Sequence, residues 1–340
     1  MITIRIKPNQ KILKGSNLSF SIVIAAKNEE TNLPGLINSL NNLIYPKEKF
    51  EIILVDDNSN DNTFTLANEL KKDIDNFNAY KISDKKLPGK KGALTFGIGR
   101  ANNPYIMITD ADCRPGPNWL NIYSGYFEKG VDFLFGISPF IQNNTLINKI
   151  SCFENLRNSI FTFAAAKIGI PYSASARNFG FRKSSFEKLN GYANTAETLS
   201  GDDDLLLKEA VKNRFKIGII INKDALVLSS AKNNFREYLI QKSRHTKTSL
   251  HYLLRHKLLL GSWHILNLLL LFSVFLYFLN PIFILLFIIK ILIDISIVSS
   301  TQKKFNYKFY IFEIFYLQVF YEIFLIINFC GALFRKDKWS

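Results

Sequence analysis

Residues 50–70, FEIILVDDNSNDNTFTLANEL, decide the expected fold, because they combine a strand, a polar turn and a helix in that order. The apolar run before Asp56 predicts a buried strand, and the apolar positions that follow the turn recur at helical spacing. Residues 18–40, LSFSIVIAAKNEETNLPGLINSL, repeat the same plan. Further strand-like runs occur at residues 78–83, 105–112 and 131–138. Strands that alternate with helices are typical of parallel sheets, so we expect an α/β fold with a mostly parallel, Rossmann-like sheet.

Polar side chains follow three of these strands at the point where each strand ends. They are Asn28 and Glu29, then Asp56 and Asp57, then Asp110 and Asp112. Ligands of open parallel sheets bind beyond the carboxyl ends of the strands, so these clusters predict a binding site at one edge of the sheet. A helix N-cap is the alternative explanation for Asp57 and the polar residues after it.

Asp110 and Asp112 stand one residue apart, directly after the apolar run 105–108. Two close carboxylates repel each other, and burying either one is costly unless a positive group compensates. One explanation is a strand-end turn with solvated aspartates. The other is a divalent cation held by the two carboxylates, with a phosphate on its far side. The motif alone leaves both explanations open.

Residues 87–98, LPGKKGALTFGI, place Lys90 and Lys91 at the expected start of a helix. The two lysines are either a solvated pair or part of a phosphate site, in which Gly89 and Gly92 let the backbone approach the ligand. The chain has no GxxxxGKS or GxxxxGKT loop, which excludes a P-loop nucleotide hydrolase.

The composition changes near residue 258, where charged residues become rare and long apolar runs begin. By composition, the chain divides into an α/β domain, residues 1–250, which the motifs discussed below mark as the catalytic domain, and a membrane region, residues 251–340. Hydrophobic helices are expected in the membrane region at about 258–279, 282–299 and 309–331. A buried helical hairpin of a soluble protein is the alternative for the first two, and the third either spans the bilayer or lies in its interface.

Charge gives the expected orientation and narrows the class of partner. Basic residues flank the first two hydrophobic runs at 242–257 and 302–308, and basic flanks stay cytoplasmic. We therefore expect an integral protein of the cell membrane with a cytoplasmic catalytic domain. The net charge is +15, but the lysines are dispersed and the aromatic residues concentrate in the hydrophobic runs, which argues against a nucleic-acid partner.

The three scattered cysteines predict a reducing compartment, without a disulfide framework or a zinc site. The first 20 residues contain no long apolar core, so no signal peptide is expected there.

Five stretches together resemble a known family. They are SIVIAAKNEE at 21–30, VDDNSNDNT at 55–63, GKKGAL at 89–94, TDADCRP at 109–115 and SGDDDLLLKEA at 200–210. In this order they resemble the family 2 inverting glycosyltransferases, and the resemblance covers roughly residues 19–250. It implies a GT-A fold, a nucleotide-sugar donor, Mg²⁺ or Mn²⁺ as cofactor, and attachment to membrane lipid through the hydrophobic helices.

The resemblance also implies a role for each matching residue. The donor nucleotide would contact Ala26, Glu29, Asp56, Asp57, Lys90 and Asp110. Asp110 and Asp112 would hold Mg²⁺ or Mn²⁺ on the donor diphosphate, and a shared ion explains why two carboxylates stand so close together.

An inverting transfer also needs a base that removes the proton of the acceptor hydroxyl. The family's E-D-x-D-L motif aligns with residues 201–205, so this chain lacks the usual glutamate and Asp202 falls on the position of the base. Asp203 is the second candidate, and Asp204 is a candidate contact of the acceptor or the diphosphate. Capping of a helix N-terminus is the alternative explanation for one or two of these aspartates.

Two further segments resemble acceptor-side parts of the family. One suggests Arg177 and Asn178 as contacts of the acceptor or the diphosphate, and a buried strand with a basic turn is the alternative. The other, EYLIQKSRHTKTS, matches the Q-x-x-R-W segment of processive members through Gln241 and Arg244. His245 replaces the tryptophan that stacks on the acceptor sugar in those members, which argues against polymer synthesis.

We therefore expect a metal-dependent, inverting glycosyltransferase that moves a sugar from a nucleotide-diphosphate sugar to a carbohydrate or lipid-linked acceptor at the cytoplasmic membrane face. A nucleotidyltransferase-like protein that binds nucleotide sugars is the alternative, because it would also combine a parallel sheet with paired aspartates. That class needs a Gly- and Arg-rich phosphate loop after the first strand, and residues 25–32, AAKNEETN, contain none. The sugar, the nucleotide and the acceptor stay open.

Overall fold

The computed structural model describes residues 18–198 and 200–334, which form two compact units. Within the described chain, the first unit contains residues 18–138 and 162–230, and the second contains 139–161 and 231–334.

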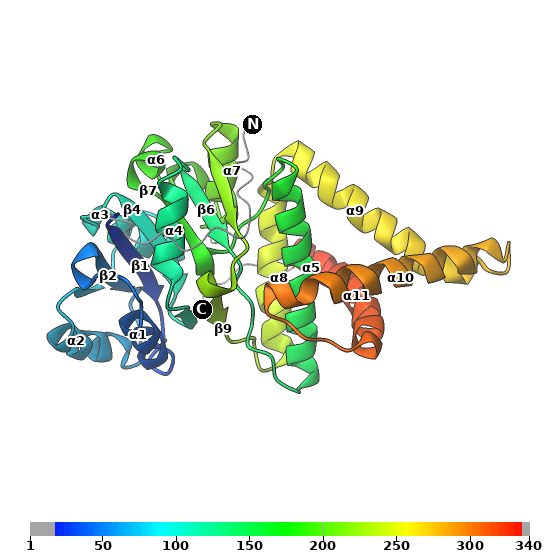
Figure 1. The fold of residues 1–340 in the computed structure, drawn as a ribbon, viewed down its shortest axis with the longest axis horizontal. Helices are drawn as coiled ribbons and strands as arrows, with labels where there is room; N and C mark the ends of the chain where they lie inside the picture. The colour runs from blue at the N-terminus through cyan, green and yellow to red at the C-terminus, as the bar shows by residue number, and fades with distance from the viewer. Residues whose placement is uncertain (1–17, 199, 335–340) are drawn as a thin grey trace. The chain divides into compact units, whose positions relative to one another are not determined.

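The first unit is built on a sheet that has seven strands within the described residues (Figure 1). In chain order they are β1 (Phe20–Ala26), β2 (Phe50–Asp56), β3 (Phe77–Lys81), β4 (Tyr105–Asp110), β6 (Phe133–Gly136), β7 (Phe179–Arg182) and β8 (Ile217–Ile220). Their spatial order is β3-β2-β1-β4-β7-β6-β8, and β7 runs antiparallel to both of its neighbours while the other pairs are parallel. The mostly parallel α/β sheet predicted from the sequence is confirmed.

Helices and a smaller strand pair complete the first unit. Its α-helices are α1 (Leu33–Asn41), α2 (Thr63–Asp73), α3 (Lys90–Arg100), α4 (Trp119–Phe127), α6 (Lys183–Lys188) and α7 (Asp204–Lys212). Short 3-10 turns are η1 (Lys47–Lys49), η2 (Ala176–Asn178), η3 (Ala193–Thr195) and η4 (Lys223–Ala225). β5 (Cys113–Pro115) and β9 (Val227–Ser229) form a separate antiparallel pair.

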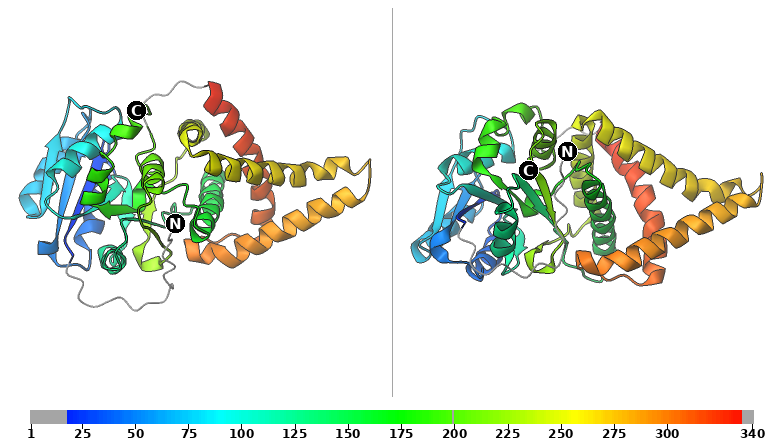
Figure 2. Two further views of the ribbon diagram at one scale, coloured as in Figure 1. Left: turned by 90° about the horizontal axis from the view of Figure 1, so that it is seen from above. Right: turned by 45° about the horizontal axis from the view of Figure 1, so that its top comes forward.

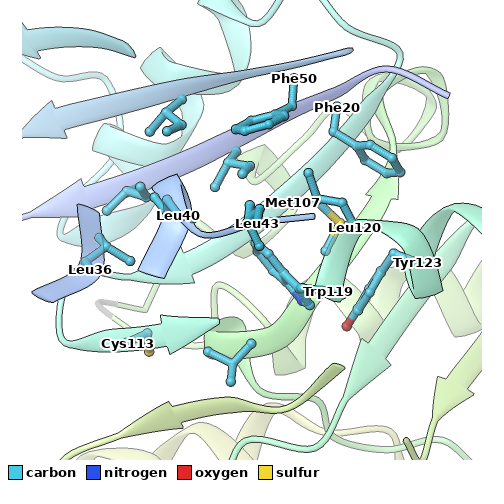
Figure 3. Close-up of a cluster of buried hydrophobic side chains, with 14 of the residues drawn as sticks. Phe20, Leu36, Leu40, Leu43, Phe50, Met107, Cys113, Trp119, Leu120 and Tyr123 are labelled. Carbon is cyan, nitrogen blue, oxygen red and sulfur yellow. The ribbon is translucent and has the colours of Figure 1, made fainter. Parts of the chain in front are cut away.

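Burial explains why these segments form a sheet. β1, β2 and β4 are apolar and buried along almost their whole length, as is typical of parallel strands covered on both faces. On one face, Phe20 and Met107 pack with Leu36 of α1 and with Trp119 and Tyr123 of α4 (Figure 3). This packing holds the central strands in register, so the loops at their ends are carried on a rigid base.

The second unit is helical. Its helices are the part of α5 (Leu146–Lys167) up to residue 161, then α8 (Phe235–Thr248), α9 (Leu254–Phe272), α10 (Ile282–Thr301) and α11 (Ile311–Phe334), with the 3-10 turns η5 (Ser249–His251), η6 (Ser273–Leu276) and η7 (Gln302–Phe305). Three segments of the described chain are long and apolar enough to cross a membrane: 254–276, 282–305 and 311–331. The three predicted hydrophobic helices are therefore confirmed within a few residues.

α9 and α10 form a hairpin, and the chain turns between them near Asn280 (Figure 2). At this turn Phe278 and Leu279 are 91% and 78% exposed. Large apolar side chains that project freely from a helical hairpin suit a lipid environment better than water.

A buried ionic cluster joins three helices of the second unit. Arg157 of α5 contacts Asp294 of α10 at 3.0 Å, and Lys290 contacts the same carboxylate at 2.6 Å. Lys290 also lies 3.7 Å from Glu322 of α11. All four side chains are almost fully buried, so their two positive and two negative charges compensate one another. Lys290 and Asp294 stand four residues apart on α10, which places their side chains on the same face of the helix.

We expect Asp294→Ala to lower the free energy of unfolding by about 3–5 kcal/mol, because it leaves Arg157 and Lys290 buried with too little negative charge. Thermal unfolding of the full chain in detergent measures this loss. Asp75→Ala is the control, since Asp75 is exposed in the first unit. A melting temperature of Asp294→Ala equal to that of the control would contradict the prediction.

α5 and α8 belong with the hydrophobic helices by packing, although their composition is mixed. Tyr238 and Lys242 of α8 both contact Glu154 of α5, the lysine at 3.3 Å. Phe153 of α5 packs against Phe309. The division by packing therefore differs from the predicted boundary at residue 250, which follows composition alone.

Candidate active site

The carboxyl ends of β1, β2 and β4 lie at one edge of the sheet. In the strand register Ala26 pairs with Asp56, and Ala25 pairs with Asp110. Because these parallel strands end together, the polar loops that follow them meet at the same edge, as the sequence predicts.

The loops after β1 and β2 bind each other. The amide of Asn28 donates to the Ser59 hydroxyl at 2.9 Å, and the amide of Glu29 donates to the Thr63 hydroxyl at 2.8 Å. In the other direction, the backbone amide of Asn60 donates to the side-chain oxygen of Asn28 at 2.9 Å. Asn28 has a φ of 56°, a left-handed conformation that asparagine tolerates better than most residues. The two loops therefore form a single rigid wall of the site.

Asp56 and Asp57 differ in what their carboxylates contact. Asp56 is fully buried, and its Oδ2 accepts the Ser59 amide at 3.2 Å. Its Oδ1 is also buried and has no hydrogen-bond partner within the described residues. Leaving a buried acceptor unsatisfied costs about 1–3 kcal/mol, so this oxygen is suited to accept a hydrogen bond from a ligand.

Asp57 is held by a lysine that sequence reasoning did not single out. Lys85 Nζ lies 2.5 Å from both carboxylate oxygens of Asp57 and donates to the Gly89 carbonyl at 3.0 Å. The contact joins residues 28 positions apart, and the only sequence signal is that Lys85 is one of several lysines before α3.

Lys90 connects two carboxylates that are far apart in the sequence. It stands at the first position of α3, and its ammonium group contacts Asp110 and lies 3.0 Å from Asp202. Burial alone would lower the pKa of Lys90, but the charges of Asp110 and Asp202 raise it well above its usual value. Burial likewise opposes ionisation of Asp202, but Lys90 lowers its pKa, so Asp202 is a carboxylate at neutral pH. Lys90 thus joins the strand-end aspartate to the aspartate triplet.

Asp110 and Asp112 fit the predicted metal. Their carboxylate oxygens and the Cys113 sulfur lie within 4.8 Å of one another. Both carboxylates are partly exposed, so an ion can reach them, and oxygen ligands suit Mg²⁺ or Mn²⁺. Burial and then the nearby Asp112 and Asp110 raise the pKa of the Cys113 thiol, so this side chain stays protonated in the core and is a poor ligand.

The three aspartates of the triplet are not equivalent. α7 begins at Asp204, Asp203 is its N-cap, and Asp202 precedes the helix. Asp203 accepts the amides of Asp204 at 2.7 Å and Ala176 at 2.8 Å. Asp204 accepts the Ser173 hydroxyl at 2.7 Å and the Ala174 amide at 3.0 Å.

Asp203 and Asp204 therefore anchor residues 173–176, which lead into β7. Burial and the neighbouring carboxylates of Asp204 and Asp202 raise the pKa of Asp203 well above its usual value. Asp202 is the member of the triplet that is joined to the metal motif, through Lys90, which contacts both Asp202 and Asp110.

Asn178, predicted as a contact of the acceptor or the diphosphate, lies in the core of the first unit. Its side chain has no exposed surface. Its Oδ1 accepts from Trp119 at 2.8 Å and from Tyr123 at 2.6 Å. Its Nδ2 donates to the carbonyls of Ile137 at 2.9 Å and Ala225 at 3.0 Å. With the amide fully used in the core, no group remains for a substrate.

The roles of Arg177, Gln241 and Arg244 as contacts of the acceptor substrate or the diphosphate stay predictions. Arg177 is partly exposed, and its guanidinium donates to the Ser229 hydroxyl at 2.5 Å. Gln241 and Arg244 lie on α8, in the second unit.

A family model matches one continuous part of the chain, which contains most of the first unit. Residues 21–189 match the model of glycosyl transferase family 2. This part of the chain is a family 2 glycosyltransferase domain. It contains the strand-end loops, Lys90 and the Asp110–Asp112 pair, whereas the aspartate triplet lies beyond the matched region.

Two relatives and one solved structure extend this result. A probable glycosyltransferase of Sulfolobus acidocaldarius is 40% identical over 121 residues, which is 35% of this chain and 26% of that protein. A beta-monoglucosyldiacylglycerol synthase of Trichormus variabilis is 36% identical over 111 residues, 33% of this chain and 24% of that protein. The matched segment thus spans about a quarter of the length of these two relatives.

The solved structure is the mannosyltransferase PcManGT of Pyrobaculum calidifontis, in complex with GDP-Man and Mn²⁺. Its TM-score to this chain is 0.61 at 14% identity, covering 94% of this chain and 88% of that one. The similarity supports a GT-A fold for the unit that contains the sheet.

Proposed function

We propose that this chain transfers a sugar, with inversion, from a nucleotide-diphosphate sugar to a carbohydrate or lipid-linked acceptor. The observation that carries the proposal is the position of Lys90, which contacts Asp110 of the metal motif and Asp202 of the triplet. Lys90 thereby joins Asp110, which would act on the leaving diphosphate through the metal, to Asp202, which would act on the attacking hydroxyl.

The wall formed by the first two loops suits the nucleotide. The unsatisfied Oδ1 of Asp56 can accept an N–H of the base, and Asp57, Glu29 and the backbone at Ala26 line the same edge of the sheet. The family 2 domain supports this assignment, and PcManGT, which has a similar fold, is described in complex with the nucleotide sugar GDP-Man.

The metal would be held by Asp110 and Asp112. When bound, Mg²⁺ or Mn²⁺ neutralises charge on the diphosphate and so makes it a better leaving group. Lys90 adds a permanent positive charge on the same side, because its raised pKa keeps it protonated. Mn²⁺ in the PcManGT complex supports a divalent ion in this fold.

Asp202 would act as the base. Its lowered pKa leaves it ionised, so it can accept the acceptor's hydroxyl proton while the oxygen attacks the anomeric carbon. Asp203 and Asp204 are already engaged with the backbone of residues 174–176, which favours Asp202 for this task.

The hydrophobic helices would attach the enzyme to the membrane with its catalytic unit in the cytoplasm. The basic residues before α9 and after α10 support this orientation. A lipid-linked acceptor fits such a location, and one relative is named for a diacylglycerol product.

The proposed function is tested by calorimetric titration of the full chain in detergent with a panel of nucleoside diphosphates and Mn²⁺. We expect saturable binding of at least one of UDP, GDP or dTDP, and much weaker binding when the metal is chelated. Binding of none of them, or equal binding with and without metal, would contradict the proposal.

Lys85→Met is expected to weaken nucleoside diphosphate binding about tenfold, because hydrogen bonds to charged groups contribute about 1.5–3 kcal/mol and Asp57 would lose its partner. The same titration measures the loss. Lys86→Met is the matched control, since Lys86 is the next residue and is exposed. Equal affinities of the two variants would show that the Lys85–Asp57 pair does not support the donor site.

A further inference from the structure

Lys91 is a fully buried lysine next to Lys90, and the two side chains contact different groups. Its ammonium donates to the Thr195 carbonyl at 2.5 Å, to the Thr198 hydroxyl at 2.8 Å and to the Thr198 carbonyl at 3.1 Å. These acceptors lie more than 100 residues away along the chain. An ammonium group has three N–H donors, and here the three contacts all go to one short segment.

Burying an ammonium group is unfavourable unless its surroundings compensate it. The direct partners of Lys91 are neutral oxygens. The charges that act on it are Asp202 and Asp203, which favour its protonated form, and Lys208, which opposes it. Burial dominates and lowers the pKa of Lys91 to about 8, so the side chain is still mostly protonated at neutral pH.

We infer that Lys91 is a positioning residue for Asp202. It binds Thr195 and Thr198, and Thr198 stands four positions before Asp202 in the chain, while Lys90 contacts the Asp202 carboxylate itself. The inference rests on the transfer reaction proposed above, in which Asp202 is the base.

The geometry separates this role from donor binding. Lys91 has no exposed surface, and the N–H groups of its ammonium are bonded to Thr195 and Thr198. The side chain therefore cannot touch the nucleotide. Loss of Lys91 should therefore change the rate of transfer and leave donor affinity unchanged. A residue that only stabilised the fold would not produce this split.

The test is Lys91→Met in the full chain, because methionine has a similar length and no charge. We expect kcat for sugar transfer to fall about 10- to 100-fold, as is typical when a reacting group is displaced by about 1 Å. Affinity for nucleoside diphosphate with Mn²⁺ should equal that of the parent. Hydrogen exchange should become faster in peptides that cover residues 193–203 and stay the same in α1 and α2.

Two further variants keep the test decisive. Lys72→Met removes an exposed lysine of α2 and should match the parent in every readout. Thr198→Val removes one of the three acceptors, together with the bond from that hydroxyl to the Ser200 carbonyl at 2.7 Å, and changes the volume little. It should give a smaller change in the same direction. If Lys91→Met does not fold, Thr198→Val alone decides.

The inference is overturned by parental kcat in a folded Lys91→Met protein, or by donor affinity that falls together with kcat. The inference is also overturned if Thr198→Val has the kcat of the parent and the same hydrogen-exchange rates as the parent. Failure of the proposed function looks different, because the parent itself would then bind no nucleoside diphosphate. The exchange measurement tests the Lys91 contact in either case.

Discussion

Asp202→Asn is expected to lower sugar transfer by about 10²–10⁴-fold, which is the usual loss when a general base is removed. The asparagine keeps the size of the side chain and can still accept a hydrogen bond from Lys90, but it cannot take up the acceptor's proton. Asp110 and Asp112 are unchanged, so affinity for nucleoside diphosphate with Mn²⁺ should be retained. Transfer rate and nucleotide affinity, measured in parallel, check both parts.

Asp203→Asn and Asp204→Asn are the matched controls. Their carboxylates bind the backbone of residues 174–176, so we expect these variants to lower thermal stability and to reduce transfer less than Asp202→Asn. If Asp203→Asn is the inactive variant and Asp202→Asn retains transfer, the base is Asp203. If all three retain transfer, the triplet serves only the structure.

Asp112→Asn is expected to remove the metal-dependent part of nucleoside diphosphate binding. Mutating a residue that hydrogen-bonds to a metal ligand lowers metal affinity about 10- to 100-fold. Loss of the ligand itself should therefore lower it by at least about 100-fold. Asp112 is partly exposed, and its replacement should leave the fold intact. Calorimetry with and without Mn²⁺ measures the effect, with Asp75→Asn as the control on an exposed aspartate. Equal Mn²⁺-dependent affinity in Asp112→Asn and the parent would contradict the metal assignment.

The fold was predictable where local sequence decides it. β1 and β2 each precede a polar turn and an amphipathic helix, and that repeated plan indicates a parallel sheet. The direction of β7 was not predictable, because it depends on the path of the chain through α5. α5 itself was not expected, since Glu154 and Arg157 interrupt its apolar pattern. Their partners lie on α8 and α10, 84 to 137 residues away.

The site shows the same division. The positions of Asp56 and Asp110 at one edge of the sheet could be predicted, because each stands at the end of an apolar strand. The position of Lys85 could not, because nothing near it in the sequence distinguishes it from a solvated lysine. For Lys91 the sequence offered a solvated pair or a phosphate site, and its contacts with Thr195 and Thr198 could not be predicted because they lie more than 100 residues away. The burial of Asn178 was not predictable either, since its four side-chain hydrogen bonds run to residues that are 41 to 59 positions distant.

The most direct test of the account is the identity of the nucleotide released when the full chain, in detergent with Mn²⁺, converts a nucleotide sugar that it binds. Phosphorus NMR of the reaction mixture distinguishes the possible products. The account predicts a nucleoside diphosphate, because the bond between the anomeric carbon and the diphosphate breaks while Asp202 activates the attacking hydroxyl. Release of a nucleoside monophosphate with a sugar phosphate would show cleavage within the diphosphate and would contradict glycosyl transfer.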